Sequence, residues 1–283
     1  MELWFTEKHS SGSGLVLRCN KTLFSGNSDI QRIDVLETEE FGRMLLLDGL
    51  VMTTERDEFI YHEMMVHPGI NLHSHAPETA LVIGGGDGGT VRELMRYNSL
   101  RKIVLCEIDS MVVEVSRQFL PGISTCLSSS NSRLEVVFQD GDMFLSDNRN
   151  VFDHIFVDSS DPAGAAEVLF SAGFYRKCFD SMRKDGILSV QSESPIYHLD
   201  LMARVREAMM EAGFADIRFC TAPVPSYPGG FWSWAVGRKS ISNHLPSGRF
   251  FLSEEEFGKL KYVTQDLLTS CFILPAFIRK ALR

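Results

Sequence analysis

The sequence predicts an α/β fold in which a small antiparallel β module precedes a mostly parallel sheet with helices on both faces. Short apolar runs alternate with amphipathic segments over residues 79–240, which is typical of repeated strand–helix–strand units. Residues 1–56 instead alternate apolar and polar positions around turns such as Asp48-Gly49, as half-buried strands do. With 283 residues, 44% of them hydrophobic, the chain can fill a sizeable core.

The expected elements follow in order. After the β module (1–56), a connecting helix is expected within residues 57–75, because four apolar residues fit one face before a Pro-Gly pair stops the pattern: Phe59, Ile60, Met64 and Val66, then Pro68-Gly69. The larger domain, 57–240, contains seven expected strands: TALVIG, KIVLCEID, RLEVVFQD, FDHIFVDSS, GILSVQSES, ADIRFCTAPV and FWSWAVGRK. The helices expected between them are GTVRELMRY, MVVEVSRQFL, AGFYRKCFDSMRKDG and LDLMARVREAMMEAGF. Residues 241–283 form a tail in which Ser253 and Glu256 fit a helix capping box.

Composition excludes several classes of protein. The net charge is −9, with no Lys/Arg-rich run, which argues against nucleic acid and anionic membrane as partners and suits a cationic ligand. No amino-terminal signal pattern and no run of about 18 apolar residues is present, so a soluble cytoplasmic protein is expected. The six cysteines form no CxxC pair, and His67, His73 and His75 lack a ligand pattern, so we expect neither disulfides nor a metal site.

The candidate site follows from the sheet. In an open parallel sheet the ligand lies beyond the carboxyl ends of the strands, at the point where the strand order reverses. Four segments come directly after predicted strands: 84–89, 107–109, 140–142 and 158–161. The chemistry is therefore expected in these segments.

The first segment contains a glycine loop. Gly84, Gly86 and Gly89 satisfy GxGxxG, and Glu107 lies 18 residues further on at the end of the next strand, where a carboxylate can accept ribose hydroxyls. Dehydrogenases and adenosine-sulfonium enzymes share this pattern. The loop alone therefore indicates a nucleoside ligand but does not separate these classes.

Asp87, in the middle of the loop, distinguishes between a dehydrogenase and an adenosine-sulfonium enzyme. A pyrophosphate or a free carboxylate near this side chain would meet a repulsion of roughly 4 kcal/mol at 4 Å for an effective dielectric near 20, whereas an ammonium would gain comparably. We therefore expect a ligand whose tail ends in an amine and lacks a carboxylate. Decarboxylated S-adenosylmethionine has that form.

A second acidic cluster, VDSSDP, places Asp158 and Asp161 three residues apart after the fourth expected strand of the larger domain. One side chain can face the pocket from the strand end and the other from the following loop. Asp161-Pro162 can equally begin a simple turn. The shared sheet edge with Asp87 favours the binding interpretation.

Further candidates are polar and aromatic residues near the same edge. Asp140 can accept an adenine amino group while Gly141 lets the ring approach the backbone, although an Asp-Gly turn also ends strands. Tyr61, His62 and Tyr227 could form the wall of an amine channel, with hydroxyl or cation–π contacts. Core packing is the alternative for each aromatic residue.

Taken together, these residues resemble the spermidine synthase family. The resemblance extends over roughly residues 30–238, in order, through LLLDGLVMTTERDEFIYHEMMVHP, VIGGGDGGTVREL, VLCEIDSMVVEVSRQFLP, DGDMFL, FDHIFVDSSDPAGAAEVLFSAGFY, ILSVQSES and YPGGFWSWAVGRK. It implies a methyltransferase-like, Rossmann-type seven-stranded domain behind the β module. It also implies a polyamine aminopropyltransferase that moves a 3-aminopropyl group from decarboxylated S-adenosylmethionine to putrescine, releases methylthioadenosine and needs no metal.

The resemblance also implies roles for individual residues. Asp158 corresponds to the catalytic base, and Asp161 to the carboxylate that holds the far amine of the diamine. The diamine site would comprise Tyr61, His62, Asp87, Asp158, Ser159, Ser160, Asp161 and Tyr227. The co-substrate site would comprise Gln31, Gly84, Gly86, Asp87, Glu107, Asp140 and Gly141. A homodimer or homotetramer is expected, mainly on the support of the family.

Three departures from the family pattern concern the acceptor side. Met52 replaces a common glutamine, Ser160 replaces a threonine, and Ala165 stands where the family has proline. The acceptor therefore stays open among putrescine, cadaverine, agmatine and longer polyamines. A small-molecule methyltransferase, a nicotinamide dehydrogenase and a non-enzymatic polyamine-binding protein remain the alternative functions.

Overall fold

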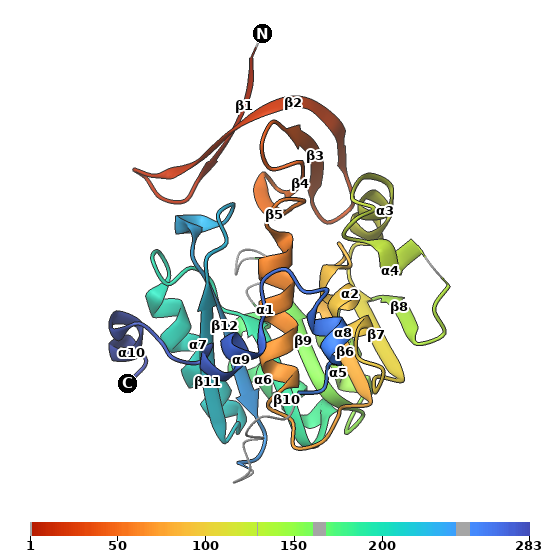
Figure 1. Cartoon of the computed structure of the whole chain (residues 1–283), viewed down its shortest axis with the longest axis vertical. Helices are drawn as coiled ribbons and strands as arrows, with labels where there is room; N and C mark the ends of the chain where they lie inside the picture. The colour runs from red at the N-terminus through yellow and green to blue at the C-terminus, as the bar shows by residue number, and fades with distance from the viewer. Residues whose placement is uncertain (1, 129, 161–167, 242–249) are drawn as a thin grey trace.

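The computed structural model describes residues 2–128, 130–160, 168–241 and 250–283. Its amino-terminal part is a five-stranded antiparallel sheet in chain order. The strands are β1 (Leu3–Lys8), β2 (Gly14–Asn27), β3 (Arg32–Thr38), β4 (Arg43–Leu47) and β5 (Leu50–Thr54). This sheet forms a module above one edge of the larger domain (Figure 1). The predicted antiparallel arrangement is therefore observed.

The larger domain is built on a seven-stranded sheet in the order β11-β12-β10-β9-β6-β7-β8. The strands are β6 (Thr79–Gly84), β7 (Lys102–Glu107), β8 (Leu134–Phe138), β9 (Phe152–Asp158), β10 (Met182–Gln191), β11 (Asp216–Ala222) and β12 (Trp232–Arg238). Only β12 pairs antiparallel to its neighbours. This mostly parallel sheet confirms the predicted fold class.

The strand order reverses between β6 and β9. From β6 the chain continues to β7 and β8 on one side, whereas β9 and β10 lie on the other. Gly84 pairs directly with Asp158 at the carboxyl ends of these two strands. The glycine loop and the acidic VDSS segment are therefore neighbours. This agrees with the rule that ligands bind beyond the carboxyl ends of parallel strands, here called the strand-end rule.

Helices cover both faces of the sheet (Figure 1). The first apolar cluster joins α1 (Glu58–Ile70), α2 (Gly89–Met95) and α4 (Thr125–Ser128) to part of the carboxyl-terminal tail. The second joins α5 (Gly141–Asp147), α6 (Ala172–Ser181), α7 (Leu199–Ala212) and α10 (Ala276–Ala281). Val112 and Val115 of α3 (Ser110–Phe119) pack with Ile33, Val35 and Leu45 of the β module, so the two parts share apolar contacts.

One predicted helix boundary is wrong, and another is met within one residue. Helix α1 continues through Pro68 and ends at Ile70. It is buried on almost every side, because the sheet, α2 and the carboxyl-terminal tail surround it. Phe59 and Ile60, which were expected on its apolar face, are only half-buried. Helix α6 ends at Ser181, and strand β10 begins at Met182. The pairing of β10 with β9 shifts in register between Met182 and Ile187, so that residues 183–186 (RKDG) belong to the strand. The sequence had suggested that these residues continue the helix.

The tail carries α8 (Glu254–Phe257), α9 (Gln265–Ser270) and α10. The predicted capping contact is confirmed, because the Ser253 side chain accepts from the Glu256 backbone N–H at 3.2 Å. Among the helices of the described ranges, none is long and apolar enough to cross a membrane.

Candidate active site

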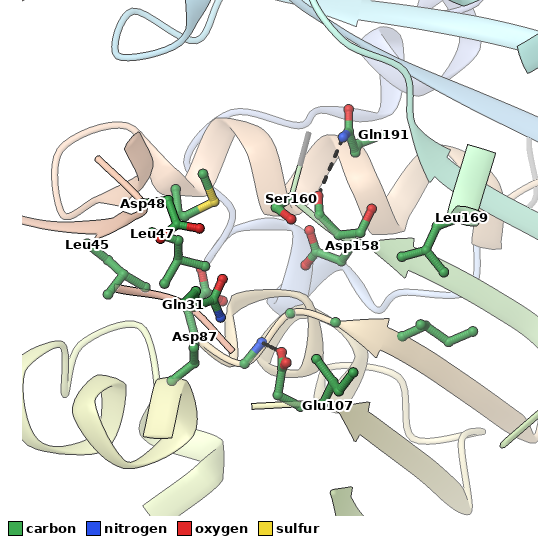
Figure 2. Close-up of a pocket in the computed structure, with 18 of the residues that line it drawn as sticks. Gln31, Leu45, Leu47, Asp48, Asp87, Glu107, Asp158, Ser160, Leu169 and Gln191 are labelled. Carbon is green, nitrogen blue, oxygen red and sulfur yellow. Dashed lines mark hydrogen bonds between the residues drawn. The ribbon is translucent and has the colours of Figure 1, made fainter. Parts of the chain in front are cut away.

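A cavity of about 470 Å³ lies at the switch point, between the β module and the carboxyl ends of the sheet. Six carboxylates line it, and the described lining residues include no Lys, Arg or His; the acids are Glu7, Asp48, Asp87, Glu107, Asp140 and Asp158. Figure 2 shows Asp87, Glu107 and Asp158 around one hollow, with Gln31 nearby. A cavity of this charge suits cationic ligands.

Glycine is required where the loop after β6 meets its neighbours. Gly84 has φ +77°, and a Cβ there would lie 2.3 Å from the Asp158 carbonyl oxygen. At Gly86 a Cβ would lie 2.8 Å from Glu107 Oε2. The loop can therefore pack against the ends of both neighbouring strands only without side chains at these positions.

Asp87 is held by the loop and by a buried histidine. Its Oδ1 accepts from the Gly89 N–H at 2.8 Å, and its Oδ2 lies 3.4 Å from His62 Nε2. Burial pushes the pKa of Asp87 upward, but the charge and hydrogen bond of His62, together with the Gly89 N–H, hold that pKa below its ordinary value. Asp87 is therefore an ionised carboxylate at the cavity wall.

His62 is part of a buried ionic network behind this wall. Its Nδ1 lies 2.7 Å from Glu58 Oε2, and Glu58 receives two hydrogen bonds from the Arg92 guanidinium, at 2.9 and 2.8 Å. Burial alone would lower the pKa of His62, but Asp87 and Glu58 raise it to about 10. His62 is thus an imidazolium between two carboxylates.

Asp158 faces the cavity from the end of β9 and receives two hydroxyl hydrogen bonds. Tyr61 donates to Oδ1 at 2.7 Å, and Thr90 donates to Oδ2 at 2.6 Å. The surrounding protein raises the pKa of Asp158 by desolvation, the nearby charge of Asp87 adds to this, and His62 with the two hydroxyls opposes it. The net direction is upward, as a general base for an amine requires.

The other end of the cavity contains groups suited to a nucleoside. Glu107 accepts from the backbone N–H groups of Gly86 and Asp109, at 3.1 and 3.0 Å, and burial raises its pKa to about 7. Asp140 lines the cavity while capping α5 through the Asp142 N–H at 2.7 Å. Asp140 therefore caps a helix and also lines the cavity, where it can contact a ligand.

Gln31 enters this end of the cavity from the β module. Its Nε2 donates to Asp109 Oδ2 at 2.9 Å, and Ser28 donates to the same oxygen at 2.7 Å. Asp109 also caps α3 through the Met111 N–H. The Gln31 side chain of the β module is therefore held at the carboxyl edge of the seven-stranded sheet.

Aromatic side chains form the wall beside Asp158. The rings of Tyr61 and Tyr227 lie 5.5 Å apart, and those of Tyr227 and Trp232 lie 4.7 Å apart. Ser159 and Ser160 line the same cavity. Asp161 and Ala165 lie outside the described residues.

Most candidate residues meet at this cavity, but His62 does not line it. The side chain is 2% exposed and lies behind Asp87, so its expected contact with the diamine stays a prediction. The Glu58–Arg92 pair holds the imidazole within the helix layer. His67 and His73 are likewise occupied, by Tyr97 and His154, and no group of potential metal ligands occurs among the described residues.

Among the polar residues that sequence reasoning missed at this site are Gln191, Thr90, Glu7 and Asp48. Gln191 ends β10 and lines the cavity, with its Nε2 3.4 Å from the Ser159 carbonyl; the strand-end rule could have found it. Thr90 follows the glycine loop directly, and position alone does not indicate its bond to Asp158. Glu7 also lines the cavity, and nothing in the sequence links strand β1 to the sheet edge.

Fold and site together define an α/β protein whose anionic cavity lies at the switch point of a mostly parallel sheet. The family model described as "Spermine/spermidine synthase domain" matches residues 58–246, and the "Spermidine synthase tetramerisation domain" matches residues 3–55. The chain therefore belongs to the spermine/spermidine synthase family. The expected enzyme class, polyamine aminopropyltransferase, is confirmed.

Individual relatives agree with this assignment. A polyamine aminopropyltransferase of Bacillus cereus is 42% identical over 280 residues, which cover 98% of each chain. A spermidine synthase crystallised with the transition-state analogue AdoDATO has a TM-score of 0.90 at 36% identity, covering 99% of this chain and 94% of the other. The spermidine synthase of Thermotoga maritima has a TM-score of 0.88 at 35% identity, with the same coverage.

Proposed function

We propose that this enzyme transfers the 3-aminopropyl group of decarboxylated S-adenosylmethionine to putrescine, giving spermidine and methylthioadenosine. The six carboxylates of a cavity without a described cationic side chain carry the proposal. Both substrates are cations, and enclosed positive charges require counter-charges. Ordinary S-adenosylmethionine would bring an additional carboxylate next to Asp87.

The proposed arrangement assigns one substrate to each end of the cavity. Glu107 accepts the ribose hydroxyls, Asp140 and Gly141 contact the adenine, and Gln31 supports this end from the β module. Asp87 pairs with the ammonium of the aminopropyl tail. The diamine lies between Tyr61 and Tyr227, with its reacting nitrogen at Asp158 and with Ser159 and Ser160 beside it. Asp161, outside the described residues, keeps the role that the resemblance implies.

The reaction is an in-line displacement at the methylene carbon next to the sulfonium. The nitrogen lone pair forms the new C–N bond, the C–S bond breaks, and its electron pair remains on sulfur as the neutral thioether of methylthioadenosine. The proton of the attacking amine goes to Asp158. Holding both substrates in line contributes through positioning.

The proton is the main energetic obstacle. An aliphatic amine has a pKa near 10.4 and an aspartate near 3.9, a gap of about 6.5 units or about 9 kcal/mol. The raised pKa of Asp158 narrows this gap. If the site binds the small neutral fraction of the amine, deprotonation before attack is not needed, and the rate with putrescine should increase into the alkaline range, where that fraction is larger.

Product analysis tests the proposal. The protein is incubated with putrescine and either decarboxylated or ordinary S-adenosylmethionine, and products are identified by mass spectrometry. Methylthioadenosine and spermidine are expected only with the decarboxylated compound. Methyl transfer from the ordinary compound would establish the methyltransferase alternative, and diamine binding without methylthioadenosine would establish a binding protein.

A panel of acceptor amines tests the acceptor separately. Putrescine is expected to give the highest kcat/KM in a comparison with cadaverine, agmatine and spermidine. A higher value for another amine would change the acceptor and leave aminopropyl transfer intact.

The match of residues 3–55 to a tetramerisation domain further supports assembly as a homodimer or homotetramer, which light scattering measures.

A further inference from the structure

Asp109 is a strand-end residue to which the proposed reaction assigns no part. It follows β7, is 3% exposed, and is not among the described residues that line the cavity. Its Oδ1 accepts from the Met111 N–H at 3.0 Å and so caps α3. Its Oδ2 accepts from two side chains of the β module, Ser28 at 2.7 Å and Gln31 at 2.9 Å. Capping α3 uses only Oδ1, so Oδ2 has a separate role at the β module.

The contact with Asp109 determines how the Gln31 side chain meets a ligand. An amide has a donor NH2 group and an acceptor oxygen, and Asp109 takes the NH2 group, because its oxygens act as acceptors in these contacts. Ser28 supports the arrangement, since its Oγ also accepts from the Gln31 backbone N–H at 3.1 Å. Gln31 lines the cavity. Its Oε1 is therefore held away from Asp109 and can accept from a ligand.

The backbone of Asp109 orients a second acceptor at the same end of the cavity. Its N–H donates to Glu107 Oε1 at 3.0 Å, and the Gly86 N–H donates to Glu107 Oε2 at 3.1 Å. Gln31 and Glu107 both border the hollow in Figure 2. A ribose presents two neighbouring hydroxyl donors, at its 2′ and 3′ carbons, and two fixed acceptors suit such a pair. One buried residue thus holds both acceptors.

We propose that Asp109 is a positioning residue for the nucleoside: its side chain orients Gln31 and its backbone orients Glu107, so that both accept from the ribose hydroxyls. The inference rests on the proposed function, which places a nucleoside at this end of the cavity. Asp109 does not contact the ligand itself. Acceptors that are already oriented lose little conformational freedom on binding, so this contact between the β module and the sheet edge selects a ribose that carries its hydroxyls.

The test combines one substitution with one pair of ligand groups. Asp109→Asn keeps an oxygen for the Met111 N–H, because Asn caps helices as well as Asp does, but turns an NH2 group toward Ser28 and Gln31. Calorimetry on the full-length enzyme compares methylthioadenosine with its 2′,3′-dideoxy analogue. We expect the Kd of methylthioadenosine to rise about 5- to 10-fold, which corresponds to one hydrogen bond, and the Kd of the dideoxy analogue to stay within about 2-fold.

The pH and a control variant separate this effect from changes in charge and stability. Burial raises the pKa of Glu107 to about 7, and the charge of Asp109 adds to this. The measurement is therefore made at about pH 8.5, where Glu107 is ionised with or without that charge. Asp153→Asn is the matched control, because Asp153 is buried, accepts from the Thr79 hydroxyl and N–H, and lies at the opposite end of the sheet. It should alter neither affinity.

Two results would overturn the inference. Equal losses for both nucleosides would mean that Asp109 only supports the start of α3, and an unchanged Kd of methylthioadenosine would mean that Gln31 and Glu107 keep their orientation without it. If Asp109→Asn does not fold, Asp109→Ser provides the second test, because serine also caps helices but is too short to hold Gln31. The same selective loss is expected, and equal losses or an unchanged Kd would contradict the proposal. Failure of the wild-type enzyme to form methylthioadenosine would instead refute the proposed function.

Discussion

Asp87 and Asp158 lie at adjacent strand ends in one cavity, yet their environments act in opposite directions. Asp87 faces the imidazolium of His62, and its pKa is lowered although burial pushes it up. Asp158 receives hydroxyl groups from Tyr61 and Thr90, and desolvation together with the charge of Asp87 raises its pKa. The same residue type thus becomes a permanent anion at one position and a proton acceptor at the other, as paired carboxylates with different roles require.

Asp158→Asn should have the largest effect on this comparison. The amide preserves the shape but cannot accept a proton, and a general base contributes about 10²–10⁴ in rate. We therefore expect kcat to fall by about this factor in a steady-state assay of methylthioadenosine release. Calorimetric affinity for methylthioadenosine should stay within about 3-fold of wild type. A kcat near wild type would remove the role of Asp158 as the base.

Asp87→Asn should have the second largest effect, on binding rather than proton transfer. Loss of the anion that pairs with the aminopropyl ammonium should weaken decarboxylated S-adenosylmethionine about 30-fold. The affinity for ordinary S-adenosylmethionine should fall far less, because the substitution also removes the repulsion between its carboxylate and Asp87. Equal weakening of both compounds in calorimetry would contradict the assignment of Asp87 to the tail.

His62→Gln should make the two carboxylates more alike. Without the imidazolium, burial of Asp87 is less opposed and its pKa should rise. Affinity for decarboxylated S-adenosylmethionine should then fall about 10-fold near neutral pH and recover as rising pH ionises Asp87. Calorimetry across pH checks this, with methylthioadenosine, which lacks the tail, as the ligand control. If the variant instead raises only the KM of putrescine, His62 contacts the diamine directly.

Thr90→Val should give the smallest effect, confined to Asp158. The Thr90 hydroxyl lowers the pKa of Asp158, so its loss should raise that pKa by up to about one unit, the equivalent of one hydrogen bond. Because Asp158 must be ionised to accept a proton, the acidic limb of the kcat/KM profile should move to higher pH. An unmoved limb with reduced kcat would indicate a packing role only. Ser253→Ala, at the cap of the remote helix α8, is the control.

The sequence was sufficient to predict the parts that depend on local pattern. Alternating apolar runs predicted both sheets, and the strand-end rule placed Asp87, Glu107, Asp140 and Asp158 at one edge, where the structure brings them to one cavity. The end of α6 and the burial of α1 on almost every side were missed, because the pattern of a single segment does not include the elements that pack around it.

The remaining features depend on groups that are distant in the sequence. Tyr61 and Asp158 are 97 residues apart, and Glu7 and Val51 are 44 apart. The position of His62 behind Asp87, rather than in the channel, likewise follows from the packing of α1 against the glycine loop.

The sequence by itself determined the order of the strands and of the longer helices, the glycine loop and the set of carboxylates at the sheet edge, because these follow from local periodicity and chain topology. Only the tertiary structure decided which carboxylate meets a cation, which meets hydroxyl groups, and that the β module adds Glu7. The physical reason is that charge interactions and desolvation depend on separation in space and on exclusion of water. Both are set when distant segments pack together.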